Sequence, residues 1–265
     1  MLQRRSVRSG DGAFVVEGVK LLDCAVDSRA SVESVYVAAG TLTVPTVRAS
    51  VERALAAGAR AFELAPGVLE KVACTVTPQP VLAVVRTPDH TLADVAGADL
   101  VVVCVDVRDP GNAGALIRSA DAAGGGGIVC CDGTVDPFNP KTVRASAGSV
   151  LHLPVVTGVS ADETLSFLSS RGYALRGAVA RGGVPHTEID WARRSALVLG
   201  NEASGLTDPI RSRLDELATV LMSGHAESLN VAIAGAVICF EALRQRAAAV
   251  GTHDELAPAT GTAQR

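Results

Sequence analysis

Long hydrophobic runs are missing from this 265-residue sequence. No apolar stretch approaches the roughly 20 residues that a membrane-spanning helix needs. The N-terminal segment MLQRRSVRSGDG has no apolar core after its arginines, which a secretory signal would require. We therefore expect a cytoplasmic protein without a membrane partner.

Metal and nucleotide signatures are also missing. The six cysteines (24, 74, 104, 130, 131 and 239) form neither a CxxC pair nor a Cys/His cluster with the spacing of metal ligands. Most of them lie inside apolar runs, which predicts buried, reduced thiols and no bound metal. The phosphate-binding patterns GxGxxG and GxxxxGK[ST] and the hydrolase pattern GxSxG do not occur.

A basic surplus is absent as well, because the formal net charge is −4 at pH 7. The molecule therefore has no global field that attracts nucleic acid. A local basic patch is enough to bind RNA, so the net charge does not decide against an RNA partner.

The pattern of apolar residues in the sequence favours an α/β fold. Apolar residues make up 48% of the chain and charged residues 20%, which is sufficient for a real core. From residue 99 onward, apolar β-rich runs alternate with helical patterns; these runs are LVVVCVDV, GIVCCDG, HLPVV, YALRGAVA, SALVLGNE and ATVLMSG. Runs that are apolar on both faces and separated by helices predict a doubly wound domain with a parallel sheet. Such sheets bind ligands at the carboxyl ends of their strands.

The first part of the chain predicts a smaller α/β domain. FVVEGVKLLDCAVDS and SVERALAAGARAFEL have helical spacing next to short β-branched runs, and a Pro-punctuated stretch near residues 88–98 predicts a boundary. We expect domains at residues 1–95 and 96–250. The remaining residues, 251–265, are small and polar, which predicts a disordered tail.

Three clusters of polar residues follow predicted strands. In the first, RDPGNAGALIR, Asn112 lies between a turn and a helical run, which predicts a helix cap, and Arg118 is then a surface arginine with a packed stem. An anion site at the helix N-terminus is the functional alternative. In the second, LGNEASG, Gly200 permits close approach of the main chain to a ligand, with the Glu202 carboxylate beside it. A strand-to-helix turn with a capping serine explains this cluster equally well.

The third cluster is VLMSGHAESLNV, in which Ser228 and Asn230 precede an almost wholly apolar helical run. Capping accounts for one of these two residues but not for both. A helix that is apolar on all sides is expected to be buried in the core or against another subunit.

Together and in this order, the three clusters resemble the signature of the SpoU/TrmH family of RNA 2′-O-ribose methyltransferases, within the SPOUT superfamily. NAGALIR is similar to N-x-G-x-x-x-R, LGNEASG to LGxExxG, and VLMSGHAESLNV to IPMxGxxxSLNV. Leu221 stands where the family has proline, so this loop is expected to be less rigid. The N-terminal unit resembles the small ribosomal-protein-like RNA-binding domain that often precedes the catalytic domain.

The resemblance implies roles for nine residues. The catalytic positions are Asn112, Arg118, Glu202, Ser228 and Asn230, and the cofactor-contacting positions are Gly200, Val220 and Leu229, with Met222 nearby. It also implies S-adenosyl-L-methionine as the cofactor, a deep trefoil knot in the C-terminal domain, and a homodimer whose active site is completed across the interface.

The resemblance further implies a structured RNA as the substrate. We expect rRNA, in particular 23S rRNA, rather than tRNA, because a separate N-terminal domain usually accompanies larger substrates in this family. Two alternatives stay open: a catalytically inactive RNA-binding or ribosome-associated protein that keeps the fold, and an antibiotic-resistance rRNA methyltransferase with the same chemistry.

In this reaction a ribose hydroxyl attacks a sulfonium methyl group in line. The family implies Arg118 as the group nearest the hydroxyl proton, but a guanidinium has a pKa above roughly 12 and is a poor base. We hypothesise that Arg118 grips the neighbouring phosphate and stabilises the developing alkoxide, while Ser228, Asn230 and Asn112 fix the geometry.

Overall fold

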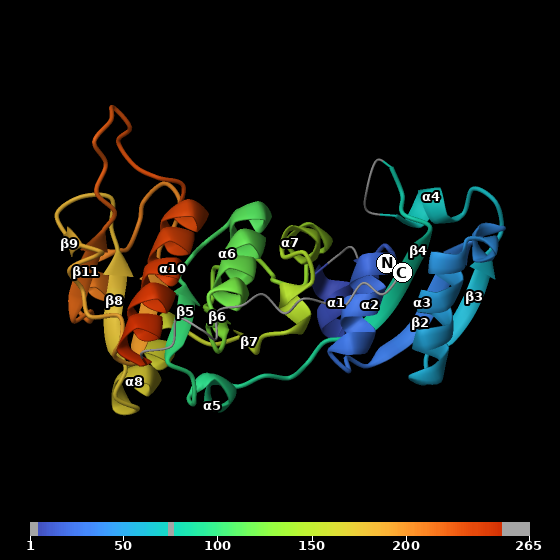
Figure 1. Ribbon diagram of the computed structural model, residues 1–265, viewed down its shortest axis with the longest axis horizontal. Helices are drawn as coiled ribbons and strands as arrows, with labels where there is room; N and C mark the ends of the chain where they lie inside the picture. Colours follow the sequence, from blue (N-terminus) through green and yellow to red (C-terminus); the bar gives the residue numbers. More distant parts are fainter. Residues whose placement is uncertain (1–4, 74–76, 251–265) are drawn as a thin grey trace.

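The computed structural model describes residues 5–73 and 77–250. Cys74 and the predicted tail at residues 251–265 lie outside the described residues. Two α/β units lie side by side along the long axis of the molecule (Figure 1).

The N-terminal unit is built on a four-stranded sheet with the strand order β1-β4-β2-β3. Its elements are α1 (Arg5–Asp11), β1 (Ala13–Glu17), α2 (Val19–Asp27), β2 (Val32–Ala38), the 3-10 turn η1 (Thr41–Thr43), α3 (Pro45–Ala56), β3 (Arg60–Leu64), α4 (Leu69–Val72) and β4 (Val81–Arg86). β4 is antiparallel to β1 and β2, and β2 is parallel to β3. The sequence predicts a small α/β unit here, and the structure confirms it.

The C-terminal unit is built on a seven-stranded sheet with the order β7-β6-β5-β10-β8-β11-β9. Its elements are α5 (Leu92–Val95), β5 (Leu100–Cys104), α6 (Pro110–Ala122), β6 (Ile128–Cys130), α7 (Pro140–Ala145), η2 (Ser149–Leu151), β7 (Val155–Thr157), α8 (Ala161–Ser170), β8 (Ala174–Ala178), β9 (Val184–Pro185), β10 (Ser195–Leu199), α9 (Asp208–Arg211), β11 (Glu216–Thr219) and α10 (Val231–Val250). Every neighbouring pair of strands is parallel. The predicted parallel α/β domain is therefore confirmed.

Both faces of this sheet are covered, because successive side chains of a strand point to opposite faces. In β5, Leu100 and Val102 pack in one apolar cluster with Leu116 of α6 and Ile238 of α10. The alternate residue Val101 packs in a second cluster with α5 and α8. Such two-sided burial explains why the strands are continuous apolar runs in the sequence.

The two units share one apolar core. Phe14 of β1 packs against Phe138, with the ring centroids 5.0 Å apart. Next to this contact, the buried Arg8 of α1 forms an ion pair with Asp136. Residue 95, the predicted end of the first domain, lies in α5, which packs against the second sheet through Leu92 and Val95.

The described cysteines are free thiols. A hydrogen bond with Cys130, followed by burial, raises the pKa of Cys104, and burial raises the pKa of Cys131 to about 11 and that of Cys239 to about 12. Protonated, buried thiols are unreactive. Buried, reduced cysteines are therefore confirmed for Cys104, Cys130, Cys131 and Cys239, whereas the free thiol Cys24 is only half-buried.

The helix that the sequence predicts after Asn230 is α10. Ile238 and Cys239 are fully buried, whereas Ile233 is 54% and Phe240 48% exposed. The single chain therefore buries only part of α10 and leaves one apolar face open, and burial of that face against another subunit stays a prediction. Across the described ranges, no helix is long and apolar enough to cross a membrane.

Candidate active site

The three polar clusters meet at the carboxyl edge of the seven-stranded sheet. NAGALIR lies in α6 after β5, LGNEASG follows β10, and VLMSGHAESLNV connects β11 to α10. β5 and β10 are direct neighbours in the sheet. The loop between β11 and α10, drawn in orange, rises above this edge (Figure 1).

A cavity of about 610 Å³ lies between these loops. Its walls come from residues 178–181, 199–206 and 227–229, from Arg211, Ala218, Val220 and Met222, and from α10. All four predicted cofactor-contacting residues line it, namely Gly200, Val220, Met222 and Leu229. Glu202 and Ser228 line it too, whereas Asn112, Arg118 and Asn230 lie outside its walls.

The start of α6 is fixed by Asp109. Its side chain accepts a hydrogen bond from the main-chain N–H of Asn112 at 2.8 Å, and Pro110 occupies the first helical turn. The prediction that Asn112 caps the helix is therefore wrong, because proline is preorganised for the first helical position and puts the cap one residue before itself. The Asp-Pro pair is the sequence signal that identifies Asp109 as the cap.

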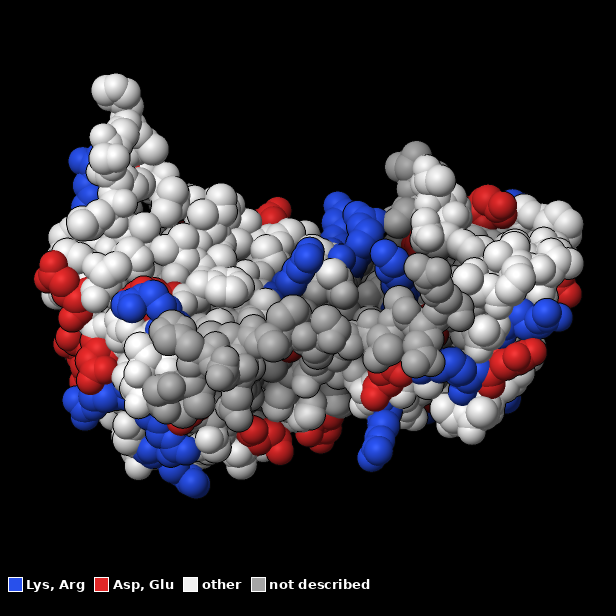
Figure 2. Space-filling view, viewed as in Figure 1, with Lys and Arg blue, Asp and Glu red and all other residues white. Residues whose placement is uncertain are grey.

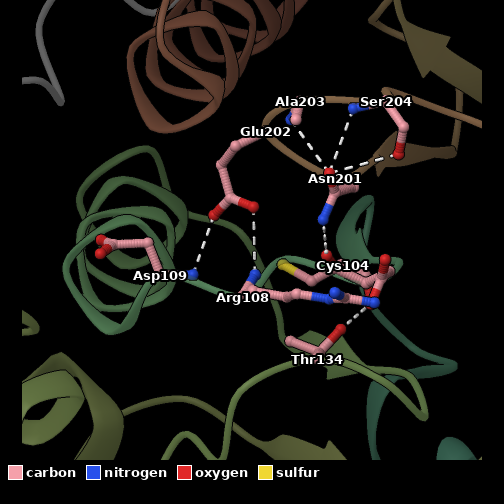
Figure 3. A network of polar contacts seen from close by, with 9 residues as sticks. Cys104, Arg108, Asp109, Thr134, Asn201, Glu202, Ala203 and Ser204 are labelled. Carbon is pink, nitrogen blue, oxygen red and sulfur yellow. Dashed lines mark hydrogen bonds and ion pairs between the residues drawn. The ribbon is translucent and has the colours of Figure 1, made fainter.

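The carboxylate of Glu202 holds this turn from the neighbouring loop. It accepts hydrogen bonds from the main-chain N–H groups of Arg108 at 3.1 Å and Asp109 at 3.0 Å and from the side-chain amide of Asn112 at 3.0 Å. Figure 3 shows the carboxylate pointing at the two main-chain nitrogens. Burial by itself raises the pKa of Glu202, but these hydrogen bonds outweigh it and hold the pKa below its usual value. The group is thus an anionic acceptor that orients the turn.

Asn112 connects this turn to α10. Its side-chain oxygen accepts a hydrogen bond from the side-chain amide of Asn230 at 2.8 Å. The oxygen of Asn230 in turn caps α10, because it accepts the N–H groups of Ala232 at 2.9 Å and Ile233 at 3.3 Å. Of the two residues before this helix, Asn230 is therefore the cap and Ser228 is not.

Asn201 fixes the LGNEASG loop from inside. Its amide donates to the main-chain oxygen of Asp106 at 2.9 Å. Its side-chain oxygen accepts hydrogen bonds from the main-chain N–H and the hydroxyl of Ser204 (Figure 3). Ser204 therefore closes the loop and caps no helix. A Cβ atom on Gly200 would lie 2.4 Å from the main chain of Gly205, so glycine is required by the loop itself, although it also lines the cavity.

Arg118 lies apart from this network. It is exposed on α6, and within residues 5–73 and 77–250 its guanidinium has no hydrogen-bond or ion-pair partner. An exposed, unneutralised guanidinium is available to a phosphate from solution.

Ser228 belongs to a loop with few internal contacts. Leu221, at the position where the family has proline, is 70% exposed. Among the described residues, the main-chain N–H and C=O groups of 221–229 form no hydrogen bonds. These groups are free to pair with a ligand in the cavity.

The cavity fits S-adenosylmethionine by size and chemistry. Its volume falls within the roughly 300–1,000 Å³ of small-molecule sites, and apolar walls next to free main-chain donors and acceptors are typical of them. Leu199, Val220 and Ile238 provide apolar surface, and Met222 and residues 227–229 provide free main-chain polar groups.

Comparison with known proteins gives matches for both units. A family model described as the SpoU rRNA Methylase family matches residues 99–240, and one described as the MRM3-like substrate binding domain matches residues 1–83. The Bacillus subtilis 23S rRNA (guanosine(2553)-2'-O)-methyltransferase RlmP is 34% identical over 239 residues, which cover 90% of this chain and 92% of that protein. A Streptomyces viridochromogenes 23S rRNA (uridine(2479)-2'-O)-methyltransferase is 31% identical over 263 residues, covering 93% and 88%.

Solved structures match the whole architecture. The SpoU methyltransferase AviRb from Streptomyces viridochromogenes, in complex with the cofactor AdoMet, has a TM-score of 0.85 at 30% identity and covers 92% of this chain and 94% of its own. This match defines the class as an α/β RNA methyltransferase of the SPOUT type. The chain belongs to the SpoU rRNA methylase family. Its reaction is the S-adenosylmethionine-dependent methylation of a ribose 2′-hydroxyl of RNA, as the three motifs predict.

Proposed function

We propose that the substrate is 23S rRNA and that methyl transfer takes place where the three loops meet. The observation that carries this proposal is the hydrogen-bonded series Glu202–Asn112–Asn230, which joins the three motifs beside the cavity. Both relatives described above are named for 2′-O-methylation of 23S rRNA. The N-terminal unit, which matches a substrate-binding domain, binds the RNA.

When bound, S-adenosylmethionine supplies an electrophilic methyl group. Gly200, Val220, Met222 and Leu229 hold the cofactor from the cavity wall. The apolar side chains exclude water from it, while the free main-chain groups of Met222 and residues 227–229 bind its polar edges.

The protein has two tasks: it orients the ribose hydroxyl and stabilises the charge left on the oxygen. Arg118 binds the phosphate next to the target ribose and stabilises the developing alkoxide, because a guanidinium stays protonated and forms bidentate hydrogen bonds. Ser228, at the cavity wall, and the amides of Asn112 and Asn230 orient the ribose. Glu202 is a positioning residue, since its carboxylate is already occupied by three donors.

The C-terminal unit contains a deep trefoil knot in this proposal. The loop at residues 200–206 is closed by the bridge between Asn201 and Gly205, and this loop and α10 line the same cavity. A Cβ on Gly235 of α10 would lie 2.4 Å from Leu116 and 2.9 Å from Leu199, so the helix is tightly seated against α6 and β10.

The active enzyme is a homodimer in this proposal. Ile233 and Phe240 are seven residues apart, which places them on the same face of α10, and both are about half exposed. A second copy covers this face. Because Ile233 is only three residues, less than one helical turn, from Asn230, the partner lies next to the site.

The non-catalytic alternative is not favoured, because all five polar positions of the motifs are present around a cofactor-sized cavity. An antibiotic-resistance role involves the same chemistry as housekeeping methylation. Comparing the drug susceptibility of cells with and without the gene distinguishes the two roles. A cytoplasmic location accords with an rRNA substrate.

Transfer of labelled methyl groups tests the proposal. The full chain is incubated with tritium-labelled S-adenosylmethionine and an unmodified 23S rRNA transcript, with bulk tRNA as a second substrate. Labelling of the 23S transcript by the wild type and not by Arg118→Ala supports the proposal. Labelling of tRNA alone contradicts the choice of substrate, and cofactor binding without labelling of either RNA supports the non-catalytic alternative.

A further inference from the structure

We propose that a basic strip holds the RNA backbone between the methyl-transfer site and the N-terminal unit. The strip consists of Arg118 on α6, Lys141 and Arg144 on α7, and Lys20 on α2. This inference rests on the proposed function, since it takes RNA as the substrate. It adds the path of the phosphates, which the catalytic residues do not specify.

The charges of the strip are not neutralised. All four side chains are exposed, and in the part of the chain that the structure describes none of their charged groups has a carboxylate partner. Four other surface arginines are paired with carboxylates, namely Arg53, Arg86, Arg213 and Arg244. Exposed arginines without a carboxylate partner also occur elsewhere, for example Arg48 and Arg171, so the strip is distinguished by the grouping of four such cations on adjacent elements of a chain whose net charge is −4.

The acidic residue nearest to α7 in the sequence is Asp136, and it is already occupied. It forms an ion pair with Arg8, which is only 5% exposed, and accepts the N–H of Phe138 at 2.9 Å. Lys141 and Arg144 therefore keep their positive charge toward solvent.

Close packing brings α7 next to Arg118. A Cβ on Gly114 of α6 would lie 2.5 Å from the Cβ of Ala145 of α7, so the two helices are in direct contact at this glycine. Arg118 is one turn further along α6, on the same side as Gly114. Lys141 and Arg144 are three residues apart and share one face of α7.

The strip continues onto the N-terminal unit. A Cβ on Gly148, just after α7, would lie 2.9 Å from the Sγ of Cys24 and 3.8 Å from the Cδ2 of Leu21, both on α2. Lys20 precedes Leu21 and is exposed. Figure 2 shows Lys and Arg side chains gathered over the saddle between the two units, where Figure 1 places α7, α1 and α2.

A row of unpaired cations on a concave surface fits a polyanion. Phosphodiesters bind to such cations with release of counterions, so affinity falls with salt, and each single-strand phosphate contact contributes about 0.7 to the slope of log affinity against log salt. Lysine and arginine bind phosphates without reading the sequence. The strip therefore positions the RNA backbone, while the methyl-transfer site selects the nucleotide that is methylated.

The test uses the double variant Lys141→Ala/Arg144→Ala in the full chain. Its matched control is Arg171→Ala/Arg193→Ala, which removes two exposed cations at the opposite, amino-terminal edge of the sheet. Binding to an unmodified 23S rRNA transcript is measured by filter binding from 50 to 200 mM salt, and methyl transfer is measured over a range of RNA concentrations. We expect the double variant to bind RNA on the order of tenfold more weakly, with the salt slope lower by about 1.4 for two lost contacts. KM for RNA rises, while kcat, cofactor affinity and Tm stay at the wild-type values.

Each other outcome is informative. Wild-type RNA affinity and salt slope in the double variant would overturn the strip, and an equal loss in the control would do the same, because the effect would then follow from total charge. If the double variant loses RNA binding although the wild-type protein transfers no methyl group, the strip stands and the proposed function fails. If methyl transfer is intact but independent of the strip, the proposed function stands and the strip fails.

Discussion

At the scale of single residues, the site is held together by side chains that bind one another. Glu202 accepts three hydrogen bonds, one of them from the side-chain amide of Asn112. Asn112 in turn accepts a hydrogen bond from Asn230, which caps α10. Asn112, at the centre of this series, is half-buried, so leaving its amide without a partner costs on the order of 1 kcal/mol. The network therefore preorganises the site before any ligand binds.

Arg118 carries the first prediction. Arg118→Ala lowers kcat by on the order of 10²–10³, the loss typical when one group that stabilises developing negative charge is removed. Arg118→Lys lowers kcat by more than about tenfold, because an ammonium cannot make the bidentate contact of a guanidinium. Single-turnover methyl transfer at saturating RNA measures both. Near wild-type turnover of Arg118→Lys with unchanged RNA binding would show that a bidentate grip is not its role.

The second prediction concerns how the contribution of Glu202 to stability depends on pH. Its pKa is lower in the folded protein than the roughly 4.3 of a free glutamate. The group therefore contributes stability that is present above about pH 4.3 and is lost as the pH falls through its lower, folded-state pKa. We expect Glu202→Gln to be less stable than the wild type at pH 7 and this difference to shrink toward pH 3, in urea unfolding at each pH.

The control for this measurement is Glu52→Gln, whose carboxylate is exposed and makes no hydrogen bond within the described ranges. Its stability difference from the wild type should not vary with pH. A constant difference for Glu202→Gln as well would contradict the proposed role of its carboxylate.

At the scale of elements, glycines decide how the helices approach. Gly114 lets α6 contact α7, and Gly235 lets α10 contact α6 and β10. Helices that touch at glycine place their neighbouring side chains close together, which positions Arg118 beside α7 and Asn230 beside Asn112.

Gly114→Ala is the third prediction. The added Cβ would meet the Cβ of Ala145 at 2.5 Å and the main-chain oxygen of Thr142 at 2.7 Å. We expect a loss of about 1–3 kcal/mol, the usual cost of overpacking, seen as a Tm lower by several degrees. Gly97→Ala is the matched control, because a Cβ there meets nothing within 4 Å and its Tm should not fall. Equal Tm values for the two variants would show that α6 and α7 are not in tight contact.

The strands of the large sheet and the main helices follow from the sequence, because apolar runs on both faces and helical spacing are local signals. The very short elements β9 and α9 carry too few residues for such a signal. The Asp-Pro pair predicts a helix cap at Asp109, whereas the polar motif, to which Asn112 belongs, favours a cap at Asn112 instead. The amide contact between Asn112 and Asn230 spans 118 positions, so no local pattern predicts it. The motifs identified the residues of the site, but only the fold shows which of them form hydrogen bonds with one another.

At the scale of the whole molecule, the open face of α10 indicates an assembly larger than one chain. Ile233→Asp is the fourth prediction: the charge falls in the middle of the proposed dimer interface, and burial of an unpaired carboxylate is strongly unfavourable. We expect the wild type to be a dimer and Ile233→Asp a monomer in light scattering coupled to size exclusion. Leu55→Asp, at an apolar position of α3 that is 46% exposed, should remain dimeric. A wild type that is monomeric, or an Ile233→Asp variant that stays dimeric, would contradict the proposed interface.

The central claim is that this chain methylates a ribose hydroxyl of 23S rRNA from the site formed by the three loops. Nucleoside mass spectrometry of an unmodified 23S rRNA transcript, after incubation with the protein and S-adenosylmethionine, tests it most directly. The account predicts a 2′-O-methylnucleoside that is formed by the wild type and is absent or strongly reduced with Asn230→Ala. A base-methylated nucleoside, or the same yield from Asn230→Ala, would contradict it.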